Sequence, residues 1–149
     1  MADLTTTITE SVILNGATRG SSNTMLTTGI VDVLERILTC AHSNTTTIGV
    51  FATSPHTSAG AIDVENTAYV RVTNLSASDA INLAVVSTAT NYTVKVRPGG
   101  SHVLYNGEDV LVAEADTNPN FTGLADLASL QVRPAGGADC QVELFVGLT

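Results

Sequence analysis

Apolar and polar residues alternate in one short segment after another along this chain, and this period of two most limits what it can fold into. In the 68–75 segment, Val70 and Val72 fall on one side of an extended chain, and Arg71 and Thr73 fall on the other. Successive side chains of a strand point to opposite faces of a sheet, so the pattern predicts a half-buried strand. The same alternation is found at 80–88, 92–97, 101–105, 110–115, 129–133 and 141–146. The chain is therefore predicted to form a succession of strands.

Turn-forming residues separate these segments. Pro98-Gly99-Gly100 cannot continue a strand, and Asn106-Gly107 is a strong hairpin signal because both residue types tolerate positive φ. Strand starts near 68, 80, 92, 101 and 110 are spaced as in β-sandwiches and barrels. Composition agrees, since the chain has 22 threonines and no tryptophan, and β-branched residues favour strands.

The first half of the chain is less regular. Strands are expected at 5–14 and 46–53, and loops at 15–23, 54–67 and 117–128. Between the first two strands, Ile30, Val33, Leu34 and Ile37 fit a helical spacing, yet the same stretch also alternates. Because its neighbours are all strands, we favour a turn at 28–32 followed by a strand to Cys40.

These segments predict an all-β, antiparallel β-sandwich of the jelly-roll kind, with about eight to ten strands in one domain over 1–149. A Greek-key sandwich is the close alternative. A parallel fold is disfavoured, because it needs helices between its strands and only one candidate exists. The core is expected to contain Val70, Val72, Leu83, Val94, Val96, Val142 and Leu144.

Charge excludes one large class of function. One lysine and five arginines face fourteen carboxylates, which gives a formal charge of −8. Nucleic-acid binders neutralise phosphates with lysine and arginine, so no nucleic-acid partner is expected.

We also expect no membrane partner and a soluble, non-secreted chain, because no long apolar run or signal-peptide pattern occurs. Cys40 and Cys140 lack metal-ligand spacing and are expected to be buried free thiols.

No pattern of residues indicates catalysis. His42, His56 and His102 are too far apart in sequence for a local metal site, and Ser101 and His102 point to opposite faces of their strand. Nucleotide-binding and hydrolase motifs are missing. We therefore expect no enzyme activity, no cofactor and no metal. Acidic pairs occur at Asp63 with Glu65, Glu108 with Asp109 and Glu114 with Asp116. One alternative stays open, because alternate positions such as 63/65 and 114/116 put two carboxylates on one side of an extended chain, where they could hold Ca²⁺ if loop carbonyls completed the shell.

Three stretches together resemble the small virion structural proteins of tailed bacteriophages, especially marine and cyanobacterial ones. They are the 68–75 segment, Ile81-Asn-Leu-Ala-Val-Val, and Tyr92-Thr-Val-Lys-Val-Arg-Pro-Gly-Gly-Ser-His-Val-Leu-Tyr-Asn-Gly. The opening Ile8-Thr-Glu-Ser-Val-Ile-Leu-Asn-Gly and the later Arg36-Ile-Leu-Thr add to the likeness. The resemblance implies a non-enzymatic capsid decoration or cement protein on the outer surface of the virion, assembled in the host cytoplasm. The expected partner is then the major capsid protein.

A weakly charged sheet surface is expected to associate, so a homo-oligomer, trimer or dimer, is also predicted. The alternative function is a receptor-binding or glycan-binding module of a phage tail or fibre. We expect residues 1–7 and the two long loops to contact the partner. The candidate contact residues are Thr5, Thr6, Thr7, Ser54, Pro55, His56, Asn118, Asn120 and Phe121.

Overall fold

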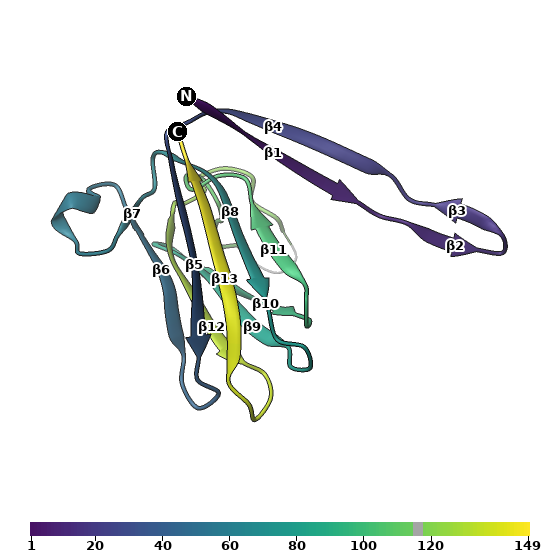
Figure 1. Cartoon of the computed structure of the whole chain (residues 1–149). Coiled ribbons are helices and arrows are strands. Elements are labelled where there is room, and N and C mark those ends of the chain that lie inside the picture. The colour runs from purple at the N-terminus through teal and green to yellow at the C-terminus, as the bar shows by residue number, and fades with distance from the viewer. Residues whose placement is uncertain (115–117) are drawn as a thin grey trace.

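Two β-sheets packed face to face form the body of the protein, and a two-stranded arm projects from one side (Figure 1). The computed structural model describes residues 1–114 and 118–149. The strands within these residues are β1 (Ala2–Thr9), β2 (Val12–Leu14), β3 (Ala17–Arg19), β4 (Ser22–Ile30), β5 (Asp32–Cys40), β6 (Thr46–Ala52), β7 (Ile62–Asp63), β8 (Thr67–Asn74), β9 (Ile81–Ser87), β10 (Asn91–Val96), β11 (Ser101–Leu104), β12 (Leu127–Pro134) and β13 (Cys140–Leu148). A single 3-10 turn, η1 (Pro55–Thr57), lies between β6 and β7.

The body consists of a four-stranded sheet in the order β11-β8-β13-β5 and a five-stranded sheet in the order β10-β9-β12-β6-β7. Neighbouring strands are antiparallel, except for the short parallel pair β6–β7. If the short strand β7 is left aside, consecutive strands from β5 to β13 lie in opposite sheets. The one exception is the pair β9 and β10, which form a hairpin within one sheet. The predicted all-β sandwich is therefore confirmed.

Alternate side chains of the two sheets meet in one buried cluster. Strand β8 buries Val70 and Val72, and β13 buries Val142 and Leu144 beside it. Of the seven predicted core residues, all are buried except Val94, which is partly buried against the same cluster. The period of two therefore identified the inward faces correctly.

The two cysteines are buried free thiols, as predicted. Cys40 on β5 lies directly opposite Cys140 on β13 in the strand register. Burial raises the pKa of the Cys40 thiol, since the thiolate would lose its hydration. Both side chains therefore belong to the packed interior.

The strand that ends at Cys40 is confirmed, and the helical alternative for this stretch is wrong. In β5, Leu34 and Leu38 pack against the core, whereas Val33 and Ile37 are exposed. The chain turns at Val31 between β4 and β5.

The loop predicted at 15–23 is wrong. Asn15 and Gly16 have φ of 52° and 78° and form the turn of a hairpin, which continues into β3 and β4. Positive φ at both central residues is the condition for a two-residue hairpin turn, and Asn-Gly meets it well. The strand predicted at 5–14 is interrupted after Thr9 and resumes at Val12.

The hairpin predicted at Asn106-Gly107 is also wrong. The Gly107 N–H donates to the Thr67 carbonyl, and a Cβ at Gly107 would lie 2.6 Å from the Val64 carbonyl oxygen. This glycine is therefore needed for a close approach of backbones and not for a turn. The strand predicted at 110–115 is reduced to one bridge between Leu111 and Ala125, and residue 115 lies outside the described residues.

The two predicted long loops contain more structure than expected. The 54–67 segment includes η1 and β7, and β8 already begins at its last residue. Within 117–128, residue 117 lies outside the described part of the chain, and β12 begins at Leu127.

Leu83 and Leu26 provide a matched test of where stability resides. Leu83 is completely buried in the core, whereas Leu26 on the arm is 58% exposed. We expect Leu83→Ala to lower the free energy of unfolding of the body by ~2–5 kcal/mol, because it leaves a cavity. Leu26→Ala should change it by less than about 0.5 kcal/mol. Urea denaturation of both variants checks this, and equal losses would contradict the assignment of the core.

Candidate functional site: the hairpin arm and the sheet face beneath it

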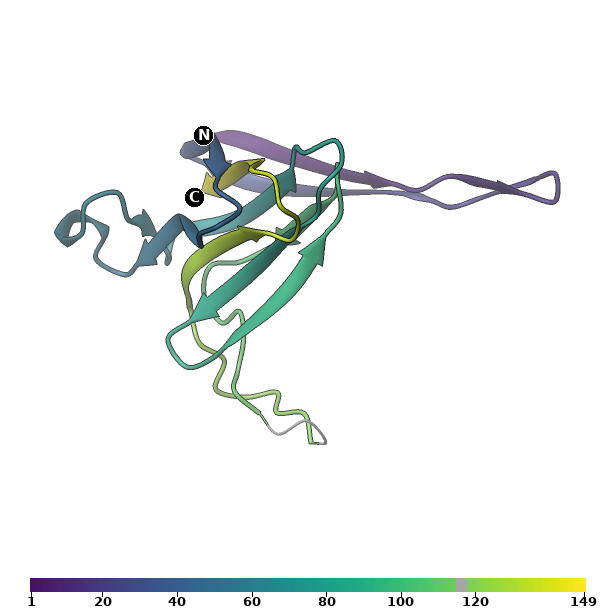
Figure 2. The same cartoon turned by 90° about the horizontal axis from the view of Figure 1, so that it is seen from below.

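The arm is a long antiparallel hairpin formed by residues 2–30. β1 pairs with β4 from Leu4 opposite Thr27 to Thr9 opposite Ser22, and the β2–β3 pair continues the hairpin to its tip. Figures 1 and 2 show the arm extending well beyond the sandwich, on the side away from η1. Neither strand of the arm joins a sheet of the body, so most of its surface meets solvent.

The two faces of the arm differ in chemistry. On one face, the hydroxyls of Thr7 and Thr24 lie 3.1 Å apart, and those of Thr9 and Ser22 lie 2.9 Å apart. Such hydrogen-bonded threonine and serine pairs across strands stabilise a sheet without apolar burial. The alternate face carries Leu4, which is partly buried against the body. The threonine-rich sequence thus makes a strand pair with one hydroxyl-covered face.

The base of the arm rests on the four-stranded sheet at Gly147. A Cβ at this glycine would lie 3.4 Å from both Leu4 Cδ2 and Ile30 Cδ1, and 3.7 Å from Tyr69 Cβ. Leu4 and Ile30 therefore lie against the sheet beside Gly147. Tyr69 is only 4% exposed although it sits on the outer face of its sheet. This contact fixes the direction in which the arm leaves the body.

A groove of about 340 Å³ lies between the arm and the sheet. Leu4 and the predicted contact residues Thr5, Thr6 and Thr7 form one wall, and Tyr69, Arg71 and Phe145 form the other. The aromatic rings pack edge to face, with Tyr69 6.0 Å from both Tyr105 and Phe145 between ring centroids. The groove therefore joins the threonine-rich strand β1 to aromatic surface from the sheet.

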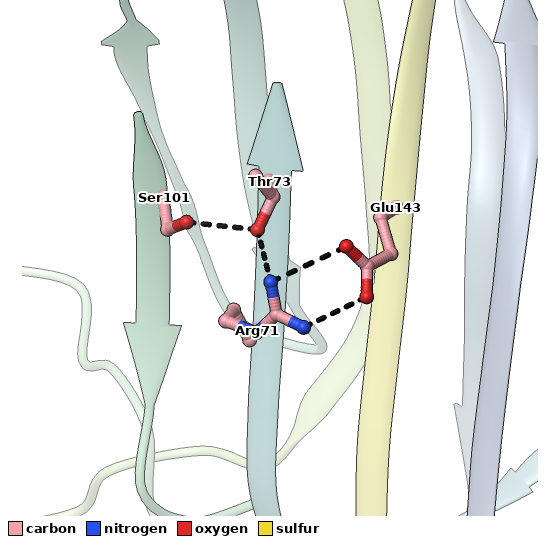
Figure 3. Close-up of polar contacts among 4 residues, drawn as sticks. All are labelled: Arg71, Thr73, Ser101 and Glu143. Carbon is pink, nitrogen blue, oxygen red and sulfur yellow. Dashed lines mark hydrogen bonds and ion pairs between the residues drawn. The ribbon is translucent and has the colours of Figure 1, made fainter. Parts of the chain in front are cut away.

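Arg71 belongs to a polar cluster that spans the three neighbouring strands β11, β8 and β13 (Figure 3). Its Nη2 lies 2.8 Å from Glu143 Oε1, and its Nη1 donates to Thr73 Oγ1, which in turn lies 2.8 Å from Ser101 Oγ. The guanidinium also lies 5.7 Å from the centroid of the Phe145 ring. The Arg71 charge is thus paired, and the cluster offers a fixed surface for polar contacts.

The tip of the arm carries the feature that sequence reasoning missed. Val12, Ile13 and Leu14 are 56%, 75% and 56% exposed. Three consecutive exposed aliphatic residues are unusual on a protein surface without a binding role. The Asn-Gly pair that follows them was the available signal, because an apolar stretch next to Asn-Gly is typical of a hairpin end.

The structure does not bring the other predicted contact residues to this site. Ser54, Pro55 and His56 lie in the η1 loop, on the opposite side of the body from the arm (Figure 1). Asn118, Asn120 and Phe121 lie in the segment before β12, which extends away from both (Figure 2). Phe121 is 84% exposed. Of the nine residues, only Thr5, Thr6 and Thr7 lie with the groove residues.

The three histidines lie apart and make local contacts. The backbone and ring of His42 both hydrogen-bond to Asp139 Oδ1, which lowers the pKa of that carboxyl. The His102 ring lies 3.0 Å from the Tyr92 hydroxyl, and burial lowers the pKa of His102 and raises that of Tyr92. Within residues 1–114 and 118–149, no three histidine, cysteine or acidic side chains are grouped as metal ligands would be.

The acidic pairs make local hydrogen bonds where they are described. Asp63 accepts hydrogen bonds from the Glu65 N–H and the Asn66 side chain. Asp109 has a φ of 52° within its loop. Asp116, the partner of Glu114 in the third pair, lies outside the described residues.

In the described part of the chain, no helix has the length and apolar character needed to span a membrane. No protein-family model matches this chain, and no curated protein sequence matches it significantly.

Loss of the Leu4 anchor should release the arm without unfolding the body. We expect Leu4→Ser to speed amide hydrogen exchange at least tenfold across the base of β1 and β4. Exchange follows the population of the locally open state, and a loss of about 1.4 kcal/mol of contact energy raises that population tenfold. The melting temperature of the sandwich should stay the same. Thr5→Ala, at an exposed position of the same strand, is the control. Unchanged exchange in Leu4→Ser would contradict the anchoring role of Leu4.

Burial of His102 predicts a loss of stability in mild acid. Its pKa in the folded protein lies below the ordinary value of 6.5, so the unfolded chain binds the proton more readily. The free energy of unfolding should therefore fall as the pH drops through 6.5, and level off below the folded-state pKa. His102→Gln should reduce this slope in urea titrations between about pH 7.5 and 5. His56→Gln controls for the removal of a histidine, and an unaltered slope in His102→Gln would refute the prediction.

Proposed function

We propose that this chain is a non-enzymatic structural protein of a phage virion, which decorates and cements the outer surface of the capsid through its hairpin arm. The observation that carries the proposal is the arm, which projects from a packed sandwich and ends in exposed Val12, Ile13 and Leu14. An isolated two-stranded hairpin is only marginally stable in water. An arm of this kind gains stability when a partner covers it.

A clamp of this shape suits a capsid physically. Packaged DNA presses on a shell from inside, and a protein that binds only the assembled lattice stabilises that state by its differential affinity. The formal charge of −8 favours a site away from DNA, on the outer surface. The proposed partner is the major capsid protein, contacted by the arm and by the Ser54–His56 and Asn118–Phe121 loops as additional contact points.

The strand order is consistent with this role. If the body strands are numbered one to eight from β5 to β13, with β7 left out, the four-stranded sheet has the order 6-3-8-1. The five-stranded sheet, again without β7, has the order 5-4-7-2. This is the order expected of a jelly roll, in which two Greek keys are folded together, and jelly rolls recur in viral capsid domains. We therefore assign the sandwich to that type as part of the proposal.

A second candidate function rests on the groove beneath the arm. Tyr69 and Phe145 supply aromatic surface there, and the threonine-rich strand β1 forms the other wall. Glycan sites combine such stacking and hydrogen-bonding groups. This favours a receptor-binding or glycan-binding module of a tail or fibre as the alternative.

Copy number and particle binding test the proposal together. We expect hundreds of copies per purified virion, since a cement protein follows the capsid lattice, whereas a tail or fibre module would give only a handful. On particles depleted of the protein, a Val12→Asp/Leu14→Asp variant should bind at least tenfold more weakly, because two carboxylates would be buried at the contact.

Val50→Asp is the matched control, since Val50 is also an exposed valine, 41% accessible, but lies on β6 in the body. A full complement of the double variant on particles would refute the arm as the clamp. Retention on host glycans together with a low copy number would favour the alternative.

A further inference from the structure

We infer that the arm tip of one copy binds a cleft at the opposite edge of a second copy of this chain, so that copies associate head to tail. The inference rests on the proposed function in treating the arm as a docking element. It assigns the tip to a second copy, so that the rest of the arm and the two loops face the capsid protein. It adds the partner surface and the residues on both sides.

The donor is the tip segment 11–19. It exposes Val12, Ile13 and Leu14, and Arg19 is paired across the hairpin with Val12. Arg19 is the one charged residue in this segment, so the tip carries +1. The whole chain carries −8, which leaves −9 on the remainder. This segment is thus apolar with one cation, and Glu10 directly precedes it.

The acceptor is a cleft of about 410 Å³ at the open edge of the sandwich, lined by β5, the η1 loop and β7. β5 and β7 are the last strands of their sheets, and edge strands with a free side are the usual place for added chain segments. Leu34, Pro55 and Ile62 give the cleft apolar walls. It therefore suits an aliphatic side chain.

Charges on the cleft complement those on the tip. Asp32 and Asp63 line it together with Arg36, so the lining carries a formal charge of −1, and the two carboxylates can meet an incoming Arg19. Arg36 extends from β5 and donates through Nη2 to the Ile48 carbonyl 2.5 Å away, while its buried Nε has no partner within the described residues. Attraction between the cationic tip and the acidic edge orients the approach of two otherwise like-charged copies.

The position of the two surfaces excludes contact within one chain. Both views show the arm leaving on one side of the body and the η1 loop with β7 on the other (Figures 1 and 2). The tip therefore reaches this cleft only on another copy. A contact between two different patches is heterologous, and it closes into a ring, such as a trimer, when the rotation between copies allows.

Site-specific cross-linking of full-length protein tests the pairing. Ile13→Cys is mixed with Ala61→Cys, whose residue lines the cleft, in the presence of oxidised glutathione. The two thiols form one disulfide, and the glutathione disulfide is reduced to two thiols. We expect a covalent pair containing one copy of each variant. Val50→Cys in place of Ala61→Cys should give no such pair, and buried Cys40 and Cys140 should not react.

Sedimentation of the wild-type protein over a range of concentrations provides the second readout. We expect reversible association that Arg19→Glu weakens about tenfold and that Arg19→Glu with Asp32→Lys restores, as for paired interface charges. A monomer at all concentrations, or an Ile13→Cys disulfide formed only between two tips, would overturn the inference. If a protein that does not self-associate still binds particles, the proposed function stands and the head-to-tail contact is refuted. If particle binding is lost while self-association is intact, the proposed function is refuted and the head-to-tail contact stands.

Discussion

Packing of alternate side chains between two sheets is the constraint on which the rest of this molecule depends. Val70, Leu83, Leu130 and Leu144 belong to one buried cluster, to which both sheets contribute. A hairpin of two strands cannot enclose a core of this kind by itself. Residues 2–30 therefore divide into a base that rests on Gly147 and Tyr69 and a tip whose apolar residues have no cover in the chain. The same physical rule that builds the body leaves the apolar residues of the arm tip exposed.

The sheet face beneath the arm shows how a rigid surface arises without a catalytic arrangement. Arg71, Thr73 and Glu143 hold each other by hydrogen bonds across neighbouring strands, and the cation also lies over Phe145. Each of these groups uses its binding capacity on another group of the same face. What remains for a partner is shape, aromatic surface and the threonine hydroxyls of β1. The proposed docking role draws on these groups.

Sequence periodicity predicted the body well and the arm poorly, for identifiable reasons. Alternation found β8, β9, β10 and β13 because each has one buried and one wetter face, and it favoured the correct strand at β5. The same logic fails for β3, which lies in the loop predicted at 15–23 and in which all three residues are exposed. Two Asn-Gly pairs were available, and only the one at Asn15-Gly16 makes a hairpin, since Gly107 is required by the closeness of the Val64 carbonyl. That distinction depends on tertiary contacts, which local sequence does not contain. The groove likewise unites Thr5–Thr7 with Arg71 and Phe145 across long sequence separations.

The central claim is that this protein acts by docking its arm within a larger assembly. An electron-microscopy map of the parent particle at side-chain resolution tests it most directly. The account predicts the sandwich on the outer face of the capsid, with Val12, Ile13 and Leu14 enclosed by protein. A map that shows the arm surrounded by solvent, or the chain inside the shell against DNA, would contradict it.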